Sequence, residues 1–119
     1  MSDCIFCRIA KGEIPCNKIY EDDDLLAFHD LHPQRPTHFL IIPKTHIESL
    51  ATAGPAHRDI LGAMLLQTGP LARKLGLDQG FRTIVNTGKI GGQEVYHLHI
   101  HVLGGPNPVG PMVSPAAGL

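Results

Sequence analysis

Three histidines alternate with aliphatic residues in one short run, His-Leu-His-Ile-His-Val-Leu at residues 97–103. In a β-strand, side chains point alternately to opposite faces, so His97, His99 and His101 would share one face. Alternate residues lie about 6.5–7 Å apart, so a small polyanion could contact two or three of the rings. A half-exposed strand face normally carries Thr, Lys or Glu, whereas three of the eight histidines fall here. The run therefore predicts a functional site rather than an ordinary half-buried strand.

The chemistry that this run supports is attack on phosphorus. Neutral imidazole has an available lone pair near neutral pH, because its ordinary pKa is about 6.5. One ring could attack the phosphorus atom while its neighbours hydrogen-bond the oxygens on which charge builds. Gly91 and Gly92, just upstream, would let backbone N–H groups approach a phosphate without obstruction by side chains. A Gly-Gly pair alone more often forms a turn, but its place before the histidines makes it a candidate anion cradle.

A second group of residues has the composition of a metal site. Cys4 and Cys7 form a Cys-x-x-Cys pair, and such a pair with two distant histidines can make a closed tetrahedral zinc site. His38 and His46 stand where apolar runs begin or end. Each alone would be interpreted as a histidine satisfied by backbone hydrogen bonds, but the cysteine pair makes His46 a candidate ligand. A redox dithiol is the alternative, although no βαβ pattern surrounds the pair.

The composition indicates one ordinary globular domain, residues 1–119, and argues against several classes of partner. Of the 119 residues, 43% are hydrophobic and 18% charged, and the formal net charge is -1. Without a cluster of Lys and Arg, attraction to nucleic acid or to anionic lipid has no support. No apolar run approaches the ~18 residues that a membrane span needs, and the N-terminus lacks the regions of a signal peptide. Three cysteines cannot all pair with one another, so we expect a cytoplasmic, reducing location.

Short elements must position these residues. A helix of one or two turns is predicted over Cys4–Ala10, and a long helix, interrupted by Gly69-Pro70, is predicted over Pro55–Leu75. Five strands are predicted, at Ile19–Tyr20, Leu25–His29, His38–Ile42, Phe81–Asn86 and the histidine run at 97–103. One main helix with hairpin-like connections predicts an α+β domain with a mostly antiparallel sheet.

The remaining segments are interpreted as packing surfaces and turns. The buried side of the long helix would carry Ile60, Met64, Leu65, Leu71, Ala72 and Leu75. The acidic run Glu21–Asp24 is interpreted as a solvated turn, because adjacent residues in a turn rarely converge on one metal ion. The tail from Asn107 to Leu119 is expected to be extended and to pack against another surface, and Cys16 is assigned no role.

The histidine run and its surroundings resemble the histidine triad signature of the HIT superfamily of nucleotide hydrolases and transferases. The flanks are similar to the Hint branch, with Gly-Gly-Gln-x-Val-Tyr before the triad at 91–96 and Gly-Gly after it at 104–105. Further matches are Cys-Ile-Phe at 4–6, Ala-Phe-His-Asp at 27–30, Pro-Thr-His-Phe-Leu-Ile-Ile-Pro-Lys at 36–44 and Val-Asn at 85–86. The resemblance covers nearly the whole chain. It implies a single HIT domain with a five-stranded, mostly antiparallel sheet, one long helix and a short N-terminal helix.

The resemblance also implies roles for individual histidines. His99 would be the nucleophile and would carry a transient nucleotidyl group on a ring nitrogen. His97 and His101 would orient it and contact the phosphate region, and His38 would support the triad. Zinc would be a structural cofactor held by Cys4, Cys7, His46 and His97, and no catalytic metal is expected.

A purine nucleotide site is implied as well. Asp30 would hold the ribose hydroxyls, since a carboxylate accepts two hydrogen bonds side by side. An apolar slot for the base would be formed by Phe6, Phe28, Leu31 and Leu40. The phosphate and leaving-group side would be lined by Asn86, Gly92, Glu94 and Val95. Glu94 stands where animal Hint proteins usually have Ser, and an ionised carboxylate there would repel a phosphate, exchange a proton with a leaving amine, or point away.

The implied function is hydrolysis of purine nucleoside phosphoramidates, in which AMP or GMP is linked to an amine, through a nucleotidyl intermediate on His99. Three alternatives stay open. They are dinucleoside polyphosphate hydrolysis, a three-histidine zinc hydrolase in which metal-bound hydroxide attacks, and a nucleotide-binding module without catalysis. Hint-like proteins pair through a joined ten-stranded sheet and facing helices, so a homodimer is expected. The apolar side chains of the long helix, and of Val109, Met112 and Val113 in the tail, are consistent with that pairing.

Overall fold

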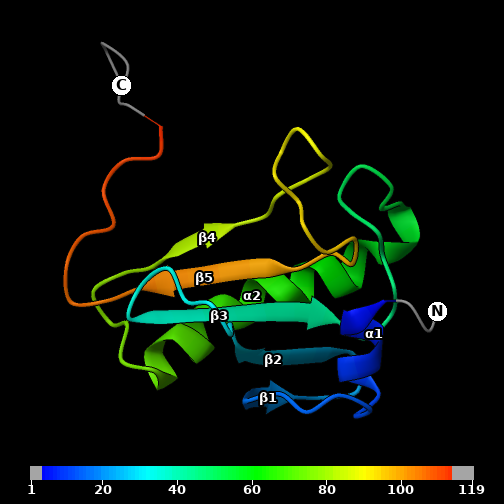
Figure 1. Ribbon diagram of the computed structural model, residues 1–119, viewed down its shortest axis with the longest axis horizontal. Helices are drawn as coiled ribbons and strands as arrows, with labels where there is room; N and C mark the ends of the chain where they lie inside the picture. Colours follow the sequence, from blue (N-terminus) through cyan, green and yellow to red (C-terminus); the bar gives the residue numbers. More distant parts are fainter. Residues whose placement is uncertain (1–3, 114–119) are drawn as a thin grey trace.

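The computed structural model describes residues 4–113, which are built on one antiparallel sheet of five strands (Figure 1). The strands are β1 (Lys18–Glu21), β2 (Leu25–His29), β3 (Thr37–Pro43), β4 (Arg82–Ile84) and β5 (Ile100–Gly104). Their order across the sheet is β1-β2-β3-β5-β4, so the histidine-bearing β5 lies between β3 and β4. The predicted α+β class and the five-stranded antiparallel sheet are confirmed.

One long helix covers one face of this sheet and lies behind it in Figure 1. The 3₁₀ turn η1 (Pro55–His57) leads directly into this helix, α2 (Arg58–Lys74). Met64, Leu71 and Ala72 of α2 are buried against the sheet. The sheet face toward α2 carries Leu25, Ala27, Phe39, Ile41, Ile100 and Val102.

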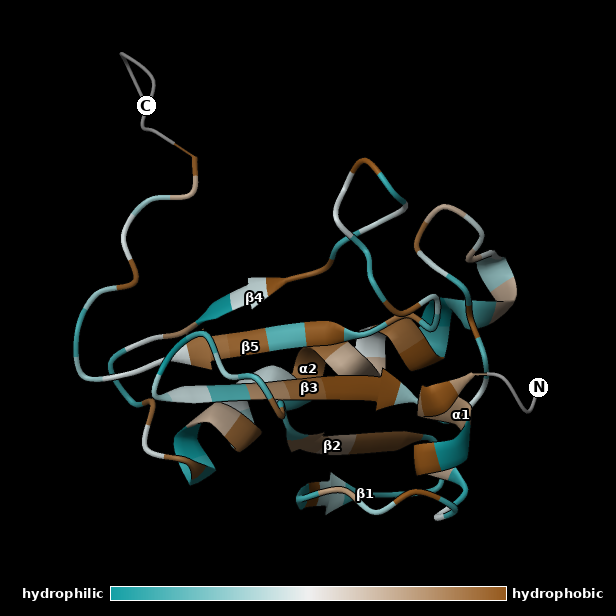
Figure 2. Ribbon diagram, viewed as in Figure 1, coloured by the Kyte–Doolittle hydropathy of each residue, from teal (hydrophilic) through white to brown (hydrophobic). Residues whose placement is uncertain are grey.

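The short helix α1 (Ile5–Ala10) packs near the other face of the sheet (Figure 1). Its Phe6 is buried among side chains of β2 and β3, which are Leu26, Phe28, Leu40 and Ile42. Because both faces are covered, β2 and β3 are hydrophobic along most of their length, as Figure 2 shows. Leu40 pairs with His101 in the register of β3 and β5, so His101 lies on the α1 side of the sheet.

The histidine run differs from the predicted strand. β5 begins at Ile100, and residues 97–99 leave the ladder before it. The N–H of Leu98 donates to the carbonyl of Ile47 at 2.7 Å, and the Nε2–H of His97 donates to the carbonyl of Pro43 at 2.7 Å. These bonds replace regular strand pairing, so the prediction that all three histidines share one strand face is wrong.

Three further expectations are corrected. The strand predicted over Phe81–Asn86 is only the three-residue β4. Leu65 is 57% exposed, and Thr68 is buried on the inner side of α2 instead. The helix continues past Gly69-Pro70 to Lys74 without a break, and the Thr68 hydroxyl donates to the carbonyl of Leu65 at 2.7 Å just before the proline.

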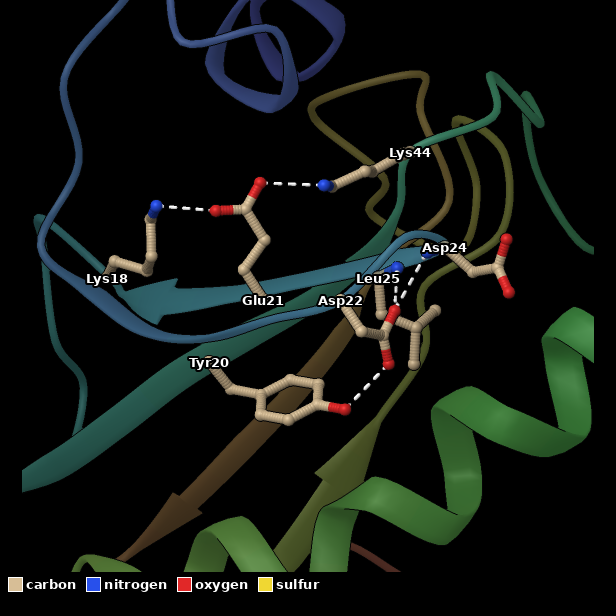
Figure 3. Close-up of polar contacts among 7 residues, drawn as sticks. All are labelled: Lys18, Tyr20, Glu21, Asp22, Asp24, Leu25 and Lys44. Atoms are coloured by element: carbon tan, nitrogen blue, oxygen red, sulfur yellow. Dashed lines mark hydrogen bonds and ion pairs between the residues drawn. The ribbon is translucent and has the colours of Figure 1, made fainter.

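The acidic run after β1 forms a hydrogen-bonded turn, drawn in Figure 3. One carboxylate oxygen of Asp22 accepts the backbone N–H groups of Asp24 and Leu25, each at 2.8 Å. Glu21 forms ion pairs with Lys18 and Lys44. Within residues 4–113, the groups able to hold a metal do not include this run.

The described part of the tail, up to Val113, forms neither helix nor strand, and the rest of the predicted tail lies outside the described residues. Arg35 donates to the carbonyl of Val109 at 3.3 Å, and Arg82 donates to the carbonyl of Gly110. Met112 is 72% exposed. Between residues 4 and 113, no helix combines the length and the apolar composition needed to cross a bilayer.

Candidate active site

A cavity of about 620 Å³ opens on the α1 side of the sheet, a size within the usual range for small-ligand sites. Residues of α1, of strands β2, β3 and β5, of the β2–β3 connection and of the loop between β4 and β5 line it. The structure gathers here twelve residues singled out from the sequence: Phe6, Phe28, Asp30, Leu31, His38, Leu40, Asn86, Gly92, Glu94, Val95, His99 and His101.

Four lining residues were not predicted, namely Ile5, Ile9, His32 and Gln34. Ile5 and Ile9 are four residues apart on α1, and that spacing places them on one helix face. This periodicity was a usable signal. His32 and Gln34 lie in an irregular connection, where no periodic pattern marks a lining residue.

His99 presents an unprotonated ring nitrogen at the cavity. Its Nδ1 lies 2.8 Å from the backbone oxygen of His97, and because a carbonyl can only accept, Nδ1 carries the proton. The lone pair of the neutral ring is therefore on Nε2. The Phe6 ring packs edge-on against the imidazole, with centroids 5.1 Å apart and planes at 88°. His99 is thus a neutral imidazole of fixed tautomer, and its Nε2 lone pair is chemically able to attack an electrophile.

A chain of hydrogen bonds sets the tautomer of His101 as well. The backbone N–H of Gln34 donates to Nδ1 of His38 at 3.0 Å, so the proton of neutral His38 is on Nε2. That Nε2 lies 2.9 Å from Nδ1 of His101 and donates to it. The remaining proton of His101 is consequently on Nε2. His101 offers an N–H donor, rather than a base, to the cavity that it lines.

Burial keeps the histidines of this site uncharged at neutral pH. Loss of hydration lowers the pKa of His99 and of His38, although Asp30 opposes the shift in both. The same burial, with the neighbouring rings of His99 and His38, lowers the pKa of His101 to about 4. Neutral rings are required for the tautomers described above.

His97 occupies a different place from the other two members of the run. Its side chain is fully buried and, unlike His99 and His101, does not line the cavity. Nε2–H donates to the Pro43 carbonyl, which leaves the lone pair on Nδ1. Its ring faces the cysteine pair, while its carbonyl orients His99.

The Nδ1 atom of His97 belongs to a four-donor cluster with Cys4, Cys7 and His46. It lies 3.3 Å from Cys4 Sγ, 3.5 Å from Cys7 Sγ and 3.2 Å from His46 Nδ1. Tetrahedral zinc with ordinary bond lengths would separate such donors by about 3.3–3.6 Å. Burial raises the pKa of the Cys7 thiol, and the Cys4 side chain raises it further, so a cation is needed to favour thiolates. The donor set fits zinc.

Asp30, His38 and His101 form a second compact group, but its hydrogen bonds argue against a metal. His38 Nε2 already carries a proton, and His101 Nδ1 accepts it. The imidazole lone pairs are therefore not available together. Asp30 Oδ2 lies 3.5 Å from His38 Nε2, and its other oxygen accepts the N–H of His32 at 2.8 Å.

Buried Gln93 holds in place the loop that contains Gly91 and Gly92, a role that was not predicted. Its amide donates to the carbonyls of Glu48 and Val95 at 2.8 and 3.0 Å and accepts the N–H of Gly88 at 2.9 Å. A Cβ on Gly91 would clash with the backbone oxygen of Thr87, and Gly92 has a φ of +84°, so both positions require glycine. Only Gly92 of this pair lines the cavity.

The fold and the site together define a histidine triad protein: the imidazole of His99, just before β5, and the N–H donor of His101, on β5, line one cavity beside the sheet. A family model described as the HIT domain matches residues 11–107. The chain belongs to the HIT family.

Similar proteins agree with this assignment. The chain is 52% identical to Protein HitA of Neisseria gonorrhoeae, covering 89% of this chain and 99% of that one. It is 43% identical to the purine nucleoside phosphoramidase of Escherichia coli K12, covering 94% of each chain. It is 47% identical to a 14 kDa zinc-binding protein of Zea mays, covering 87% of this chain and 83% of that protein. These relatives confirm the resemblance to the Hint branch.

Solved structures agree in fold. A histidine triad protein from Clostridium difficile is 47% identical, with a TM-score of 0.88 over 93% of this chain and 97% of that one. A HIT family hydrolase from Clostridium thermocellum is 38% identical, with a TM-score of 0.90 over 96% and 99%. The prediction of an enzyme of the histidine triad type is confirmed at the level of the family.

Proposed function

We propose that the protein hydrolyses purine nucleoside phosphoramidates, releasing AMP or GMP and an amine. The observation that carries the proposal is the unprotonated Nε2 of His99 in a nucleotide-sized cavity. The 43% identity to a purine nucleoside phosphoramidase supports this substrate class. The base would lie against Phe6, Phe28, Leu31 and Leu40, and Asp30 would accept hydrogen bonds from the ribose hydroxyls.

In the first step, the Nε2 lone pair of His99 forms a bond to phosphorus. The P–N bond of the substrate breaks with its electron pair on nitrogen, which takes a proton from water and leaves as the amine. His99 becomes a nucleotidyl imidazolium, whose Nδ1–H donates to the His97 carbonyl. That carbonyl stabilises the positive charge, and the N–H of His101 stabilises the phosphoryl oxygens.

In the second step, water attacks the phosphorus atom from the cavity. The bond between phosphorus and Nε2 breaks, its electron pair returns to His99, and the attacking water loses a proton to solvent. The product is the nucleoside monophosphate, and the histidine is restored in its original tautomer. The carbonyl oxygen of His97 accepts the Nδ1–H of His99 in both steps. Nε2 of His99 therefore remains the atom that bonds to phosphorus throughout the reaction.

Zinc is proposed as a structural cofactor. Cys4, Cys7, His46 and His97 would hold it, and when bound it would cross-link α1 to the segment before β5 without taking part in the reaction. This role is supported by the chemistry of the donors and by the similar protein of Zea mays, which is named for zinc binding. His97 would then have one atom in each function: Nδ1 toward zinc and the carbonyl oxygen toward His99.

The decisive experiment is trapping of the covalent intermediate. The protein is mixed with an adenylate that has a fast leaving group, quenched, digested and examined by mass spectrometry. An adenylyl adduct on His99 is the expected result. An adduct on another residue, or none during steady turnover, contradicts the mechanism.

The alternatives predict different results. Diadenosine polyphosphates turned over faster than adenosine phosphoramidate would favour the polyphosphate hydrolase. Activity that disappears with removal of metal while the fold persists would favour a zinc hydrolase. Among residues 4–113, however, the groups that could hold a metal do not include His97, His99 and His101 together. Tight nucleotide binding without turnover of either substrate would indicate a binding module.

A twofold homodimer is proposed as the working assembly. Leu65 and Leu66 are 57% and 78% exposed on the outer side of α2, which gives this helix a second apolar face. The exposed Met112 and Val113 would find cover on a neighbouring subunit. A twofold interface is self-complementary, so a single substitution in it acts twice.

A further inference from the structure

The charges around the cavity differ from those of an ordinary polyanion site. Among the described residues, its lining contains two carboxylates, Asp30 and Glu94, and neither Lys nor Arg. Lys89, on the same loop as Glu94, does not line it. Burial lowers the pKa values of His38 and His101, so these rings add N–H dipoles rather than positive charge. The formal charge around a bound phosphate is therefore negative.

The two carboxylates have different positions and different partners. Asp30 follows β2 and approaches His38, with Oδ2 3.5 Å from Nε2. Glu94 is exposed on the loop between β4 and β5, and the ion pairs found within residues 4–113 do not include it. In Figure 1 the β2–β3 connection and this loop lie toward opposite ends of the sheet. With ribose at Asp30 and phosphorus at His99, the departing group lies toward Glu94.

We infer that Glu94 selects the leaving group by charge, so that the enzyme prefers nucleoside phosphoramidates whose amine carries a further positive charge. Leaving groups that carry a carboxylate or additional phosphates would meet repulsion from the same side chain. This inference rests on the proposed function, because it specifies the amine of that substrate class. It also gives a physical reason for discrimination against dinucleoside polyphosphates, whose departing portion is anionic.

The expected size of the effect follows from the exposure of Glu94. One opposite charge at contact distance changes an equilibrium or rate by about fivefold even with the full screening of bulk water. Asp30 does not supply this selection, because it lies at the nucleoside end, where every substrate of the class is the same. Glu94 acts as a specificity residue on the substrate's leaving group.

The test uses adenosine phosphoramidates of three amines of equal chain length: putrescine, which adds a cation, butylamine, which adds none, and γ-aminobutyrate, which adds an anion. AMP release gives kcat/KM for each. The wild type should rank them in that order. In Glu94→Gln, which keeps the shape and removes the charge, the putrescine to γ-aminobutyrate ratio should fall about fivefold or more.

Asp78→Asn is the matched control, because it removes one negative charge from an exposed residue that does not line the cavity. Its ratio should equal that of the wild type. Both substrates are measured on the same protein, so partial misfolding lowers both rates and leaves their ratio unchanged.

Salt provides a second measurement that needs no variant. Raising ionic strength from about 0.1 M to about 1 M shortens the screening length from about 10 Å to about 3 Å, so the wild-type ratio should fall toward one. A ratio that is unaffected by both Glu94→Gln and salt overturns the charge selection while phosphoramidase activity stands. Failure of the wild type to release AMP from any of the three would instead refute the proposed function, and this inference with it.

Discussion

Substitutions at the neighbouring positions 99 and 100 should affect different properties, with His99→Ala abolishing turnover and Ile100→Ala lowering stability. Ile100 is 3% exposed and belongs to the core between the sheet and α2. Ile100→Ala removes three carbon atoms, a loss of about 0.8 kcal/mol each in transfer free energy. A residual cavity of about 80 Å³ would add up to about 2 kcal/mol, for a total of about 2.5–4.5 kcal/mol.

His99→Ala should cost much less stability, although the side chain is only 6% exposed. The ring borders a cavity that water can enter, so its truncation enlarges that space rather than opening a void in the core. The main loss is one hydrogen bond to the His97 carbonyl, about 0.5–1.5 kcal/mol. Turnover should nevertheless disappear, because this variant lacks the proposed nucleophile.

Urea unfolding followed by circular dichroism, at a fixed zinc concentration, measures both variants. With about 2.1 cal/mol/K of unfolding entropy per residue over 119 residues, Ile100→Ala should also lower Tm by roughly 10–18 °C. Its folded fraction should keep turnover. Equal destabilisation by the two substitutions would refute the claim that Ile100 packs in the core while His99 borders the cavity. Ordinary turnover in His99→Ala would refute the assignment of His99 as the nucleophile.

Four further results are expected. Elemental analysis should find about one zinc per chain in the wild type and none in Cys4→Ser. Cys16→Ser should retain the zinc, because Cys16 lies outside the four-donor cluster. Equal loss of zinc in both variants would contradict the site. The pH profile of kcat/KM should stay flat from about pH 8 to below the ordinary imidazole pKa of about 6.5, because burial lowers the pKa of His99. A loss of activity that begins at or above about pH 6.5 would contradict this expectation. Glu21→Gln should lower the urea midpoint at neutral pH but hardly change it near pH 2. Ion pairing lowers the pKa of Glu21 in the folded state to about 2. The stabilisation from ionised Glu21 is therefore present above its unfolded-state pKa and is lost as the pH falls through its folded-state pKa. A midpoint difference that persists near pH 2 would count against that reasoning. Light scattering should give twice the chain mass of 12.9 kDa for the wild type and a smaller mass for Leu66→Glu, whereas a fully active wild-type monomer would rule out the dimer.

The central strands could be predicted from the sequence because both are buried on two faces. Leu25–His29 and the apolar part of Thr37–Pro43 are continuous hydrophobic runs bounded by turn-forming residues. The irregular start of the histidine run could not be predicted. His97 pairs with a carbonyl 54 residues away, and the N–H of Leu98 pairs with Ile47, so long-range partners override the local alternation.

The members of the candidate site were accessible through resemblance, but the division of labour among them required geometry. Residue types alone could not place His97 in the cysteine cluster and outside the cavity. Nor could they assign the protons of His99 and His101, which depend on one hydrogen-bond partner each. The brace formed by Gln93 joins segments 45 residues apart, so no short sequence window contains it.

The hydrogen-bond chain that ends at His101 begins at a peptide group, the N–H of Gln34. A side-chain donor could be lost by many substitutions, but this one is common to every amino acid except proline. The tautomer of His101 therefore depends on the path of the backbone at position 34, whereas the Gln34 side chain takes part in lining the cavity. The two prolines that bracket this segment, Pro33 and Pro36, restrict that path. Every substitution at position 34 except proline should accordingly preserve the donor that fixes the tautomers of His38 and His101.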